Sequence, residues 1–167
     1  MKNKFDLIMA MSEDGYFAID DLDNMQWTGG VDKTIFKVLS FYDNPTILCG
    51  PKTFESLPLP LQGRRVMVVR SSNKKSSYYH SAAAFAEEIN FAKLKKAKHL
   101  NRSAIVGGPK LALAAIEAKL IKQAYITVIP KKLKTGIGWE LSDFLKTRSH
   151  TKLKFRNDIE LRKYGLQ

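Results

Sequence analysis

Short apolar runs alternate with turn signals along the chain, and the spacing of the apolar residues changes from run to run. FDLIMAM (5–11) is a continuous apolar run that stops at Ser12-Glu13-Asp14-Gly15, as a buried strand does. From Asp32 the apolar residues recur at helical spacing until Asp43-Asn44-Pro45 ends the pattern. The same patterns predict strands at 5–11, 46–50, 64–70, 103–108 and 122–130, and helices at 32–42, 82–98 and 109–120, with a short helix starting at Pro51.

The order of these elements predicts the fold class. Strand, helix and strand follow one another at 46–70 and again at 103–130, and two such βαβ units favour a parallel sheet with helices on both faces. The tail KLKFRNDIELRKYG (152–165) alternates polar and apolar residues around Asn157-Asp158, which predicts an antiparallel hairpin. We therefore expect one α/β domain over residues 1–167, with a mixed, mostly parallel central sheet, flanking helices and a C-terminal hairpin.

Composition and charge indicate the cellular compartment of this domain and the kinds of ligand it could bind. The 167 residues are 44% apolar and include one cysteine, Cys49, inside an apolar run, so a reducing compartment is expected. No signal-peptide pattern occurs, and no apolar run approaches the length of about 18 residues that spans a membrane, which indicates a cytoplasmic protein without a membrane partner. The three histidines lack the spacing of metal ligands, so we expect no metal site. A net charge of +12 favours anionic ligands.

Two strand-to-helix junctions share the sequence Gly-Pro-Lys, at 50–52 and at 108–110. Glycine permits close approach to the backbone, proline needs no N–H donor at the first helical position, and a helix N-terminus attracts anions. The two junctions could hold the pyrophosphate of a dinucleotide between them, although Gly-Pro is also a common way to start a helix. The G-x-G-x-x-G fingerprint of the ordinary dinucleotide-binding fold is absent.

RSSNKK (70–75) follows a predicted strand at its carboxyl end, where open α/β sheets bind ligands. Arg70, Ser71 and Ser72 supply a guanidinium and two hydroxyls, which suit a phosphomonoester such as the 2′-phosphate of NADPH. A solvated basic loop is the alternative interpretation of the same residues.

Asp32 lies in WTGGVDKTIFK (27–37), and two interpretations of it stay open. An aspartate that precedes a helical pattern is a favoured N-cap. A helix starting there would also place Asp32, Ile35, Phe36 and Leu39 along one stripe, with a carboxylate at the edge of an apolar wall. Such a place disfavours the charged form unless a cationic or hydrogen-bonding ligand meets it, so Asp32 is a candidate ligand-binding acid.

Lysine-rich stretches at 93–98, 130–134 and 146–156 raise a different class of function, a basic module that binds nucleic acid without catalysis. These lysines also fit the polar sides of elements whose apolar residues face a core, and no aromatic platform interleaves with them. We therefore expect no nucleic-acid partner.

Six segments, in order along the chain, resemble the dihydrofolate reductase family. They are LIMAMSEDGYFA (7–18), MQWTGGVDKTIFK (25–37), TILCGPKTFESLP (46–58), LQGRRVMVV (61–69), AIVGGPKL (104–111) and AYITVIP (124–130). The resemblance implies that family's three-layer fold and an NADPH-dependent oxidoreductase that reduces 7,8-dihydrofolate to 5,6,7,8-tetrahydrofolate for one-carbon metabolism and nucleotide biosynthesis. We expect a monomer whose partner is the small-molecule substrate.

The resemblance also implies which residues form the pterin site. Asp32 would hydrogen-bond the ring nitrogen and the 2-amino group of the pterin, Trp27 would support that carboxylate through ordered water, and Thr127 would do so through its hydroxyl. Arg64 would pair with the α-carboxylate of the substrate's glutamate. The pterin and benzoyl pocket would be lined by Ile8, Met9, Ala10, Phe36, Leu57, Leu61 and Val106.

For NADPH, the positions that match the family are Ala10, Ala18, Gly50, Lys52, Thr53, Arg70, Ser71, Gly107, Gly108, Lys110 and Leu111. The loop from Asp14 to Met25, here named the lid loop, matches the family's mobile lid, with Met25 over the nicotinamide. Three positions depart from the family pattern. Lys33 stands where an apolar or aromatic residue is usual, Pro51 replaces a basic cofactor contact, and Ala112 replaces a frequent pocket tyrosine.

MSEDGYFA (11–18) also resembles the start of the reductase domain of riboflavin biosynthesis, which shares the fold and NADPH but reduces a ribosylamino-pyrimidine. The acid after Trp27 and the segment TFESLP…GRR favour folate, since a glutamate tail requires an arginine such as Arg64. A riboflavin-type reductase is the alternative function.

Overall fold

The structure of the protein is a computed structural model that describes residues 5–21, 23–71 and 87–166. Its strands are β1 (Phe5–Ser12), β2 (Thr46–Cys49), β3 (Arg65–Arg70), β4 (Glu87–Asn90), β5 (Ser103–Gly107), β6 (Ile121–Ile129), β7 (His150–Lys154) and β8 (Glu160–Gly165). Its α-helices are α1 (Gly29–Val38), α2 (Pro51–Ser56), α3 (Phe91–Lys96), α4 (Pro109–Glu117) and α5 (Trp139–Lys146). Short helical turns lie at η1 (Gln26–Thr28), η2 (Leu39–Asp43) and η4 (Arg156–Asp158). Among these described residues, no helix has the length and apolar character of a membrane span.

The strands form one sheet in the order β4-β3-β2-β5-β1-β6-β8-β7. Neighbours from β4 through to β6 pair in parallel, and β8 and β7 extend the sheet as an antiparallel hairpin beside β6. The expected α/β fold, with a mostly parallel sheet and a C-terminal hairpin, is confirmed. Because β2 and β5 are neighbours in this order, the junctions from β2 to α2 and from β5 to α4 lie side by side near the centre of the sheet.

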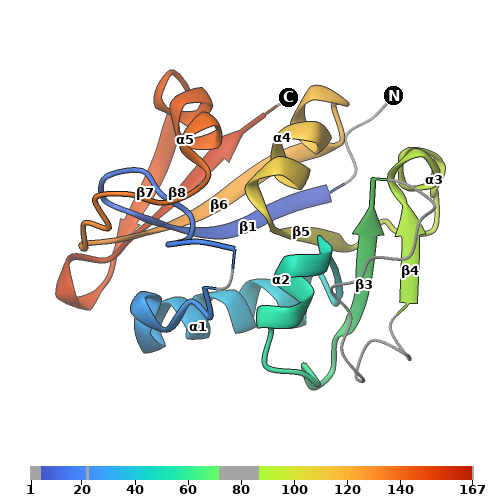
Figure 1. The fold of residues 1–167 in the computed structure, drawn as a ribbon, viewed down its shortest axis with the longest axis horizontal. Coiled ribbons are helices and arrows are strands. Elements are labelled where there is room, and N and C mark those ends of the chain that lie inside the picture. The colour runs from blue at the N-terminus through green and yellow to red at the C-terminus, as the bar shows by residue number, and fades with distance from the viewer. Residues whose placement is uncertain (1–4, 22, 72–86, 167) are drawn as a thin grey trace.

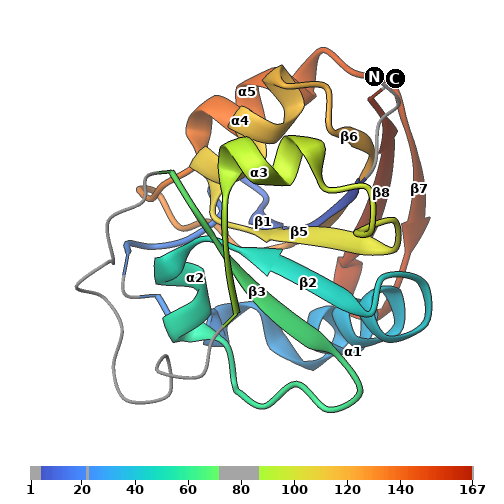
Figure 2. The same cartoon turned by 90° about the vertical axis from the view of Figure 1, so that its right-hand side faces the viewer.

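Helices cover both faces of this sheet (Figures 1 and 2). α1 and α2 lie on one face, and α3, α4 and α5 lie on the other. The strand side chains alternate accordingly. Leu48 and Val69 point into the main core beneath α3, α4 and α5, whereas their neighbours Cys49 and Val68 pack against Phe54 of α2.

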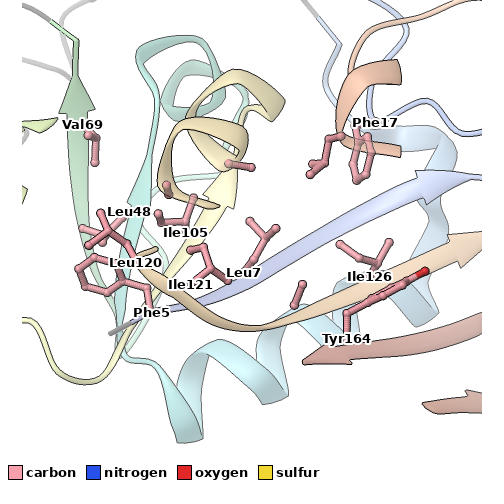
Figure 3. Close-up of a cluster of buried hydrophobic side chains, with 14 of the residues drawn as sticks. Phe5, Leu7, Phe17, Leu48, Val69, Ile105, Leu120, Ile121, Ile126 and Tyr164 are labelled. Carbon is pink, nitrogen blue, oxygen red and sulfur yellow. The ribbon is translucent and has the colours of Figure 1, made fainter. Parts of the chain in front are cut away.

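The main core is built from fully buried strand residues, including Phe5, Leu7, Ile105 and Ile126 (Figure 3). Burial of each such side chain contributes about 1.5–3 kcal/mol. Phe17, from the loop after β1, packs into the same core, so this end of the lid loop is fixed to the body of the protein.

The helix predicted at 82–98 is wrong over residues 87–90, and residues 82–86 lie outside the described residues. Glu87–Asn90 form β4, which pairs in parallel with β3. The helix begins only after Asn90, whose side-chain oxygen accepts a hydrogen bond from the Ala92 N–H at 2.8 Å. Edge pairing with β3 therefore overrides the high helix propensity of this segment, and an N-cap within it separates strand from helix.

One helix, α5, was not predicted from the sequence. Gly138 precedes it in the left-handed conformation, at φ 92°, where a Cβ would lie 2.7 Å from the Phe17 ring. The two glycines at 136 and 138 are typical of a loop. The buried residues that follow them, Leu141, Ser142 and Leu145, have helical spacing. α5 covers the start of the lid loop on the face opposite α1.

Candidate active site

Helix α1 begins at Gly29, and Thr28 occupies the N-cap position. Asp32 is therefore inside the first turn, and the interpretation of Asp32 as the N-cap is wrong. Asp32, Phe36 and Ser40 follow at four-residue spacing along α1 and η2, which places them on one stripe of the helical surface. From Asp32 to Ser40 this stripe runs about 12 Å along the helix axis.

The Asp32 carboxyl group is held between α1 and the sheet. The nearby hydroxyls of Thr28 and Thr127 both favour its charged form. Thr127 lies in β6 opposite Ala10 of β1. Burial raises the pKa of Asp32 above its ordinary value, and the two hydroxyls and the positive charge of Lys33 offset only part of that rise. A ligand that presents hydrogen-bond donors would stabilise the charged form.

Arg64 lies at the other end of the same stripe. Its Nη1 donates to Ser40 Oγ at 2.9 Å, and its guanidinium carbon lies 5.7 Å from the centre of the Phe36 ring. Burial lowers the pKa of Arg64, yet arginine keeps its charge in proteins. The stripe thus carries an acid at one end, a guanidinium at the other and an aromatic ring between them.

The apolar residues predicted for the pocket divide between the two faces of the sheet. Leu57 and Val106 pack against the cluster under α2, and Leu61 is buried in the loop after α2. Ile8 is buried between Leu7 and Met9, whose side chains belong to the opposite face. Met9 packs against the main core there, so strand alternation keeps its side chain away from Asp32.

The two Gly-Pro-Lys junctions lie side by side at the carboxyl ends of β2 and β5. The Gly50 N–H donates to the Gly107 carbonyl oxygen at 2.8 Å. Gly107 has φ +146°, and a Cβ there would lie 3.0 Å from Thr53 Oγ1, so a side chain has no room. A Cβ on Gly50 would lie 3.7 Å from the Gly108 nitrogen. The arrangement leaves bare backbone where α2 and α4 begin, as a phosphate site requires.

Two basic side chains predicted for cofactor binding are paired with acids of this chain. Lys52 Nζ lies 2.6 Å from Asp21 Oδ2 of the lid loop. Arg70, only 8% exposed, donates to Glu88 Oε1 at 2.6 Å. The pairing of Arg70 escaped the sequence prediction because β4, which carries Glu88, was predicted as helix.

The remaining positions predicted for the cofactor divide by exposure. Ser71 and Lys110 are exposed at the ends of β3 and of the second junction, and Ser72 lies outside the described residues. Leu111 packs against the main core instead. Ala18, in the lid loop, pairs with Ile137 through an isolated antiparallel bridge.

Asp23 organises the end of the lid loop. Its carboxylate accepts hydrogen bonds from the backbone N–H groups of Ile19, at 2.6 Å, and Met25, at 2.7 Å. It also accepts the indole N–H of Trp27 at 2.8 Å. The one N–H group of the Trp27 side chain therefore points to the lid loop. The resemblance implied that it points to Asp32. Met25 itself is half-buried in a left-handed conformation at φ 60°.

Three residues of this site were not predicted from the sequence. Thr28 was not predicted as the N-cap because aspartate is preferred to threonine at that position, and Thr28 makes no side-chain cap hydrogen bond. Asp23 is one of several acids in the lid loop, and nothing in the sequence distinguishes it. Lys33 was noted as a departure from the family pattern, but its partners depend on the path of the lid loop.

Comparison with known proteins finds a matching family and structures of similar fold. Residues 4–157 match the sequence pattern of the family described as dihydrofolate reductase. The fold resembles the crystal structure of a Shewanella sp. PV-4 protein named for riboflavin biosynthesis, with a TM-score of 0.70, 17% sequence identity and coverage of 99% of this chain and 98% of that one. A search of curated proteins found no match. The family match extends over nearly the whole chain and includes β1, α1, both junctions and Thr127, so the chain belongs to the dihydrofolate reductase family.

Proposed function

We propose that the protein is an NADPH-dependent reductase of 7,8-dihydrofolate. The observation that carries the proposal is the stripe on α1 and η2. A half-buried carboxylate, Asp32, and a guanidinium, Arg64, lie at its two ends, with Phe36 between them. A ligand with a hydrogen-bond donor pair at one end, a ring system in the middle and a carboxylate at the other end fits that order. Dihydrofolate has those parts in that sequence.

Asp32 would bind the donor pair. Its two oxygens can accept the ring N–H and the 2-amino group of the pterin side by side, and a buried site strengthens such a pair. With both oxygens engaged in this way, Asp32 would be bound as a carboxylate, because the donor pair offsets the effect of burial on its pKa. The proton that N5 of the substrate takes up would arrive through water. C6 of the substrate receives the hydride, so the C6–N5 double bond becomes a single bond.

The described residues fit NADPH at the two junctions. Gly50, Gly107 and Gly108 expose backbone beside the starts of α2 and α4, and Thr53 closes against them. Lys52 and Ser71 lie at the same edge of the sheet and would add a cation and a hydroxyl. When bound, NADPH supplies the hydride. In the lid loop, Met25 would cover the nicotinamide.

A second candidate function is reduction of a ribosylamino-pyrimidine. The likeness to the Shewanella sp. PV-4 protein favours it, because the two chains align over nearly their full lengths. A pyrimidine with an amino group beside a ring N–H presents the same donor pair to Asp32. Arg64 would then meet a phosphate in place of a carboxylate.

The experiment that separates the two candidates is NADPH oxidation measured with each substrate in turn. We expect absorbance loss with 7,8-dihydrofolate and little with the ribosylamino-pyrimidine. Methotrexate, which carries the folate donor pair and glutamate tail, should bind tightly and inhibit. Oxidation with the pyrimidine alone, together with weak methotrexate binding, would replace the first candidate by the second.

A further inference from the structure

A polar pocket lies where the central strands begin, at the opposite end of the sheet from the two Gly-Pro-Lys junctions. The junctions follow the carboxyl ends of β2 and β5, whereas the pocket lies beside the amino ends of β1, β2, β5 and β6. Its volume is about 420 Å³, within the range of about 300–1,000 Å³ of small-molecule sites. Each described residue that lines it carries a polar group: two are acids, two are cations, three are amides and one is a tyrosine. A ligand of this pocket would therefore be polar.

Asp6, in β1, is the buried acid of this pocket. The residue is 3% exposed, and its Oδ2 accepts a hydrogen bond from the side-chain N–H of Asn44 at 2.9 Å. Its Oδ1 accepts no hydrogen bond from the described part of the chain. A buried carboxylate oxygen without a hydrogen-bond donor costs free energy, and such an atom in a native protein needs an explanation. Asp6 therefore offers a ligand one unused acceptor.

Lys122, in β6, lies beside that acceptor. Its Nζ is 3.5 Å from Asp6 Oδ1, which is longer than the usual N–H···O distance of about 2.7–3.2 Å. The Lys122 side chain is 36% exposed, so it can turn toward solvent without disturbing the core. An ammonium group of a ligand could then donate to Asp6 Oδ1, and Lys122 would remain close enough to pair with an anionic group of the same ligand.

The other charged residues of the pocket complete a balance of charge. Asp43 adds a second carboxylate and Arg102 a second cation, and the Arg102 guanidinium donates to the main-chain carbonyls of Tyr42 and Asp43. Burial and the negative charges of Asp6 and Asp43 raise the pKa of Tyr125, so both acids act on the lining of the pocket. Two acids and two cations leave no formal net charge. A zwitterion matches this lining better than a simple anion or cation does.

We propose that this pocket is a second binding site, and that it takes a small zwitterion with adjacent ammonium and carboxylate groups, the arrangement of a polar α-amino acid. The ammonium would bind Asp6, and the carboxylate would bind Lys122. Because these two side chains are neighbours, the two charges of the ligand must be neighbours as well. The amides of Asn101 and Gln123 would meet a polar side chain of the ligand. The pocket shares no residue with the α1 stripe or with the two junctions, so the inference does not depend on the proposed function.

The test is a titration of the full chain with L-glutamine, followed in amide NMR spectra. We expect saturable shifts of the Gln123 backbone amide and of the Asn44 side-chain amide, which donates to Asp6. Three probes separate the two charges. Ethylammonium lacks the carboxylate, propionate lacks the ammonium, and 5-aminovalerate holds the two groups far apart. Each should bind at least about tenfold more weakly than L-glutamine, because a charge-assisted hydrogen bond is lost.

Variants locate the site. Asp6→Asn and Lys122→Met should each weaken L-glutamine binding by about tenfold or more. Lys132→Met, which removes an exposed charge beyond the other end of β6, should leave it unchanged. Arg64→Leu should also leave it unchanged, which excludes capture of the ligand carboxylate at the candidate active site. Since Lys122 has an exposed side chain, its variant keeps the test valid if Asp6→Asn unfolds.

Three results would overturn the proposal: no saturable shift at Gln123, binding of any of the three probes as tight as that of L-glutamine, or unchanged L-glutamine binding in Lys122→Met. Because the titration contains neither NADPH nor dihydrofolate, absence of dihydrofolate turnover would reject the proposed function and leave the result for this pocket intact.

Discussion

Asp32 and Asp23 lie close together along the chain, but their surroundings differ. Asp23 accepts three hydrogen bonds, all from N–H groups of the lid loop and Trp27, and so holds a fixed local structure. Asp32 is half-buried, and its pKa is raised because the loss of solvent around it outweighs the support of Thr28, Lys33 and Thr127. A carboxylate that is buried and incompletely supported costs stability, and such a cost is typical of a residue retained for function.

The stability of the Asp32→Asn variant should therefore depend on pH in a defined direction. Burial makes the folded state bind the Asp32 proton more tightly than the unfolded chain does. Wild-type stability falls as pH rises from the unfolded pKa, about 3.9, through the raised folded value, and the loss persists at neutral pH. In thermal melts, Asp32→Asn should be more stable than wild type at pH 7, and this advantage should shrink toward pH 4. An equal difference at both pH values would contradict this linkage.

Arg64 has a natural control in its neighbour. Arg65 is exposed and pairs with Glu87 through Nε, at 2.8 and 2.9 Å, far from the α1 stripe. Replacing Arg64 by Leu should weaken dihydrofolate binding by about 2 kcal/mol, or roughly thirtyfold, because a charge-assisted contact to the carboxylate is lost. Fluorescence titrations should find NADPH affinity nearly unchanged, and Arg65→Leu should alter neither. Equal losses for the two ligands would refute the placement of Arg64.

The roles of single residues could be predicted from the sequence only where the residues lie in a contiguous, recognisable motif. The acid five positions after Trp27 and the arginine after Gln62-Gly63 were found because the motif around each is contiguous. The direction of the Trp27 indole N–H was not predicted, because its partner, Asp23, belongs to the lid loop. No periodic pattern in the sequence determines the path of that loop. Lys33 was unexplained for the same reason.

At the scale of elements, the lid loop is tied to α2 as well as to α1. Asp21 holds Lys52, which we propose contacts the cofactor, so the lid loop and an anionic cofactor compete for one ammonium. Asp21→Asn should bind NADPH up to about fivefold more tightly, since exposed ion pairs are worth about 0.2–1 kcal/mol. Calorimetric titration gives the measurement. The gain should disappear in a Lys52→Met background, and a gain that survives there would exclude this pairing as its cause.

Strand β4 offers a matched pair of acids. Glu88 pairs with Arg70, which is 8% exposed, whereas Glu87 pairs with the exposed Arg65. Glu88→Gln should lower the free energy of unfolding by about 2 kcal/mol, because a buried guanidinium loses a charged hydrogen-bond partner. Glu87→Gln should cost about 0.5 kcal/mol or less. Urea denaturation of the two variants checks the difference, and similar losses would show that the burial of Arg70 does not decide it.

Helices and strands whose apolar residues recur with a regular period were predicted well. Elements that form because of contacts with other parts of the chain were not predicted. The central strands have continuous apolar runs, and Pro51 and Pro109 mark the starts of α2 and α4. β4 lacks such a run. Its Glu87 and Glu88 pair with β3 in the sheet, and their carboxylates bind Arg65 and Arg70 of that strand. α5 is short and begins after a left-handed glycine, so its start resembled a loop.

At the scale of the whole molecule, the residues of the candidate site come from several elements around the centre of the sheet. β1 and β6 provide Ala10 and Thr127, α1 provides Asp32, and the two junctions provide the glycine backbone. The net charge of +12 adds a positive field that attracts anionic ligands such as NADPH and dihydrofolate. The same charge opposes self-association, and the monomer stays a prediction.

The central claim is that Asp32 binds the pterin ring of a folate substrate. It is tested most directly by the initial rate of NADPH oxidation at neutral pH with saturating 7,8-dihydrofolate, in wild type and in Asp32→Asn. We expect substrate-dependent oxidation by the wild type and a loss of at least about a hundredfold in the variant, the scale on which removal of one preorganised electrostatic contact slows a reaction. An Asp32→Asn variant that retains full turnover would contradict the account.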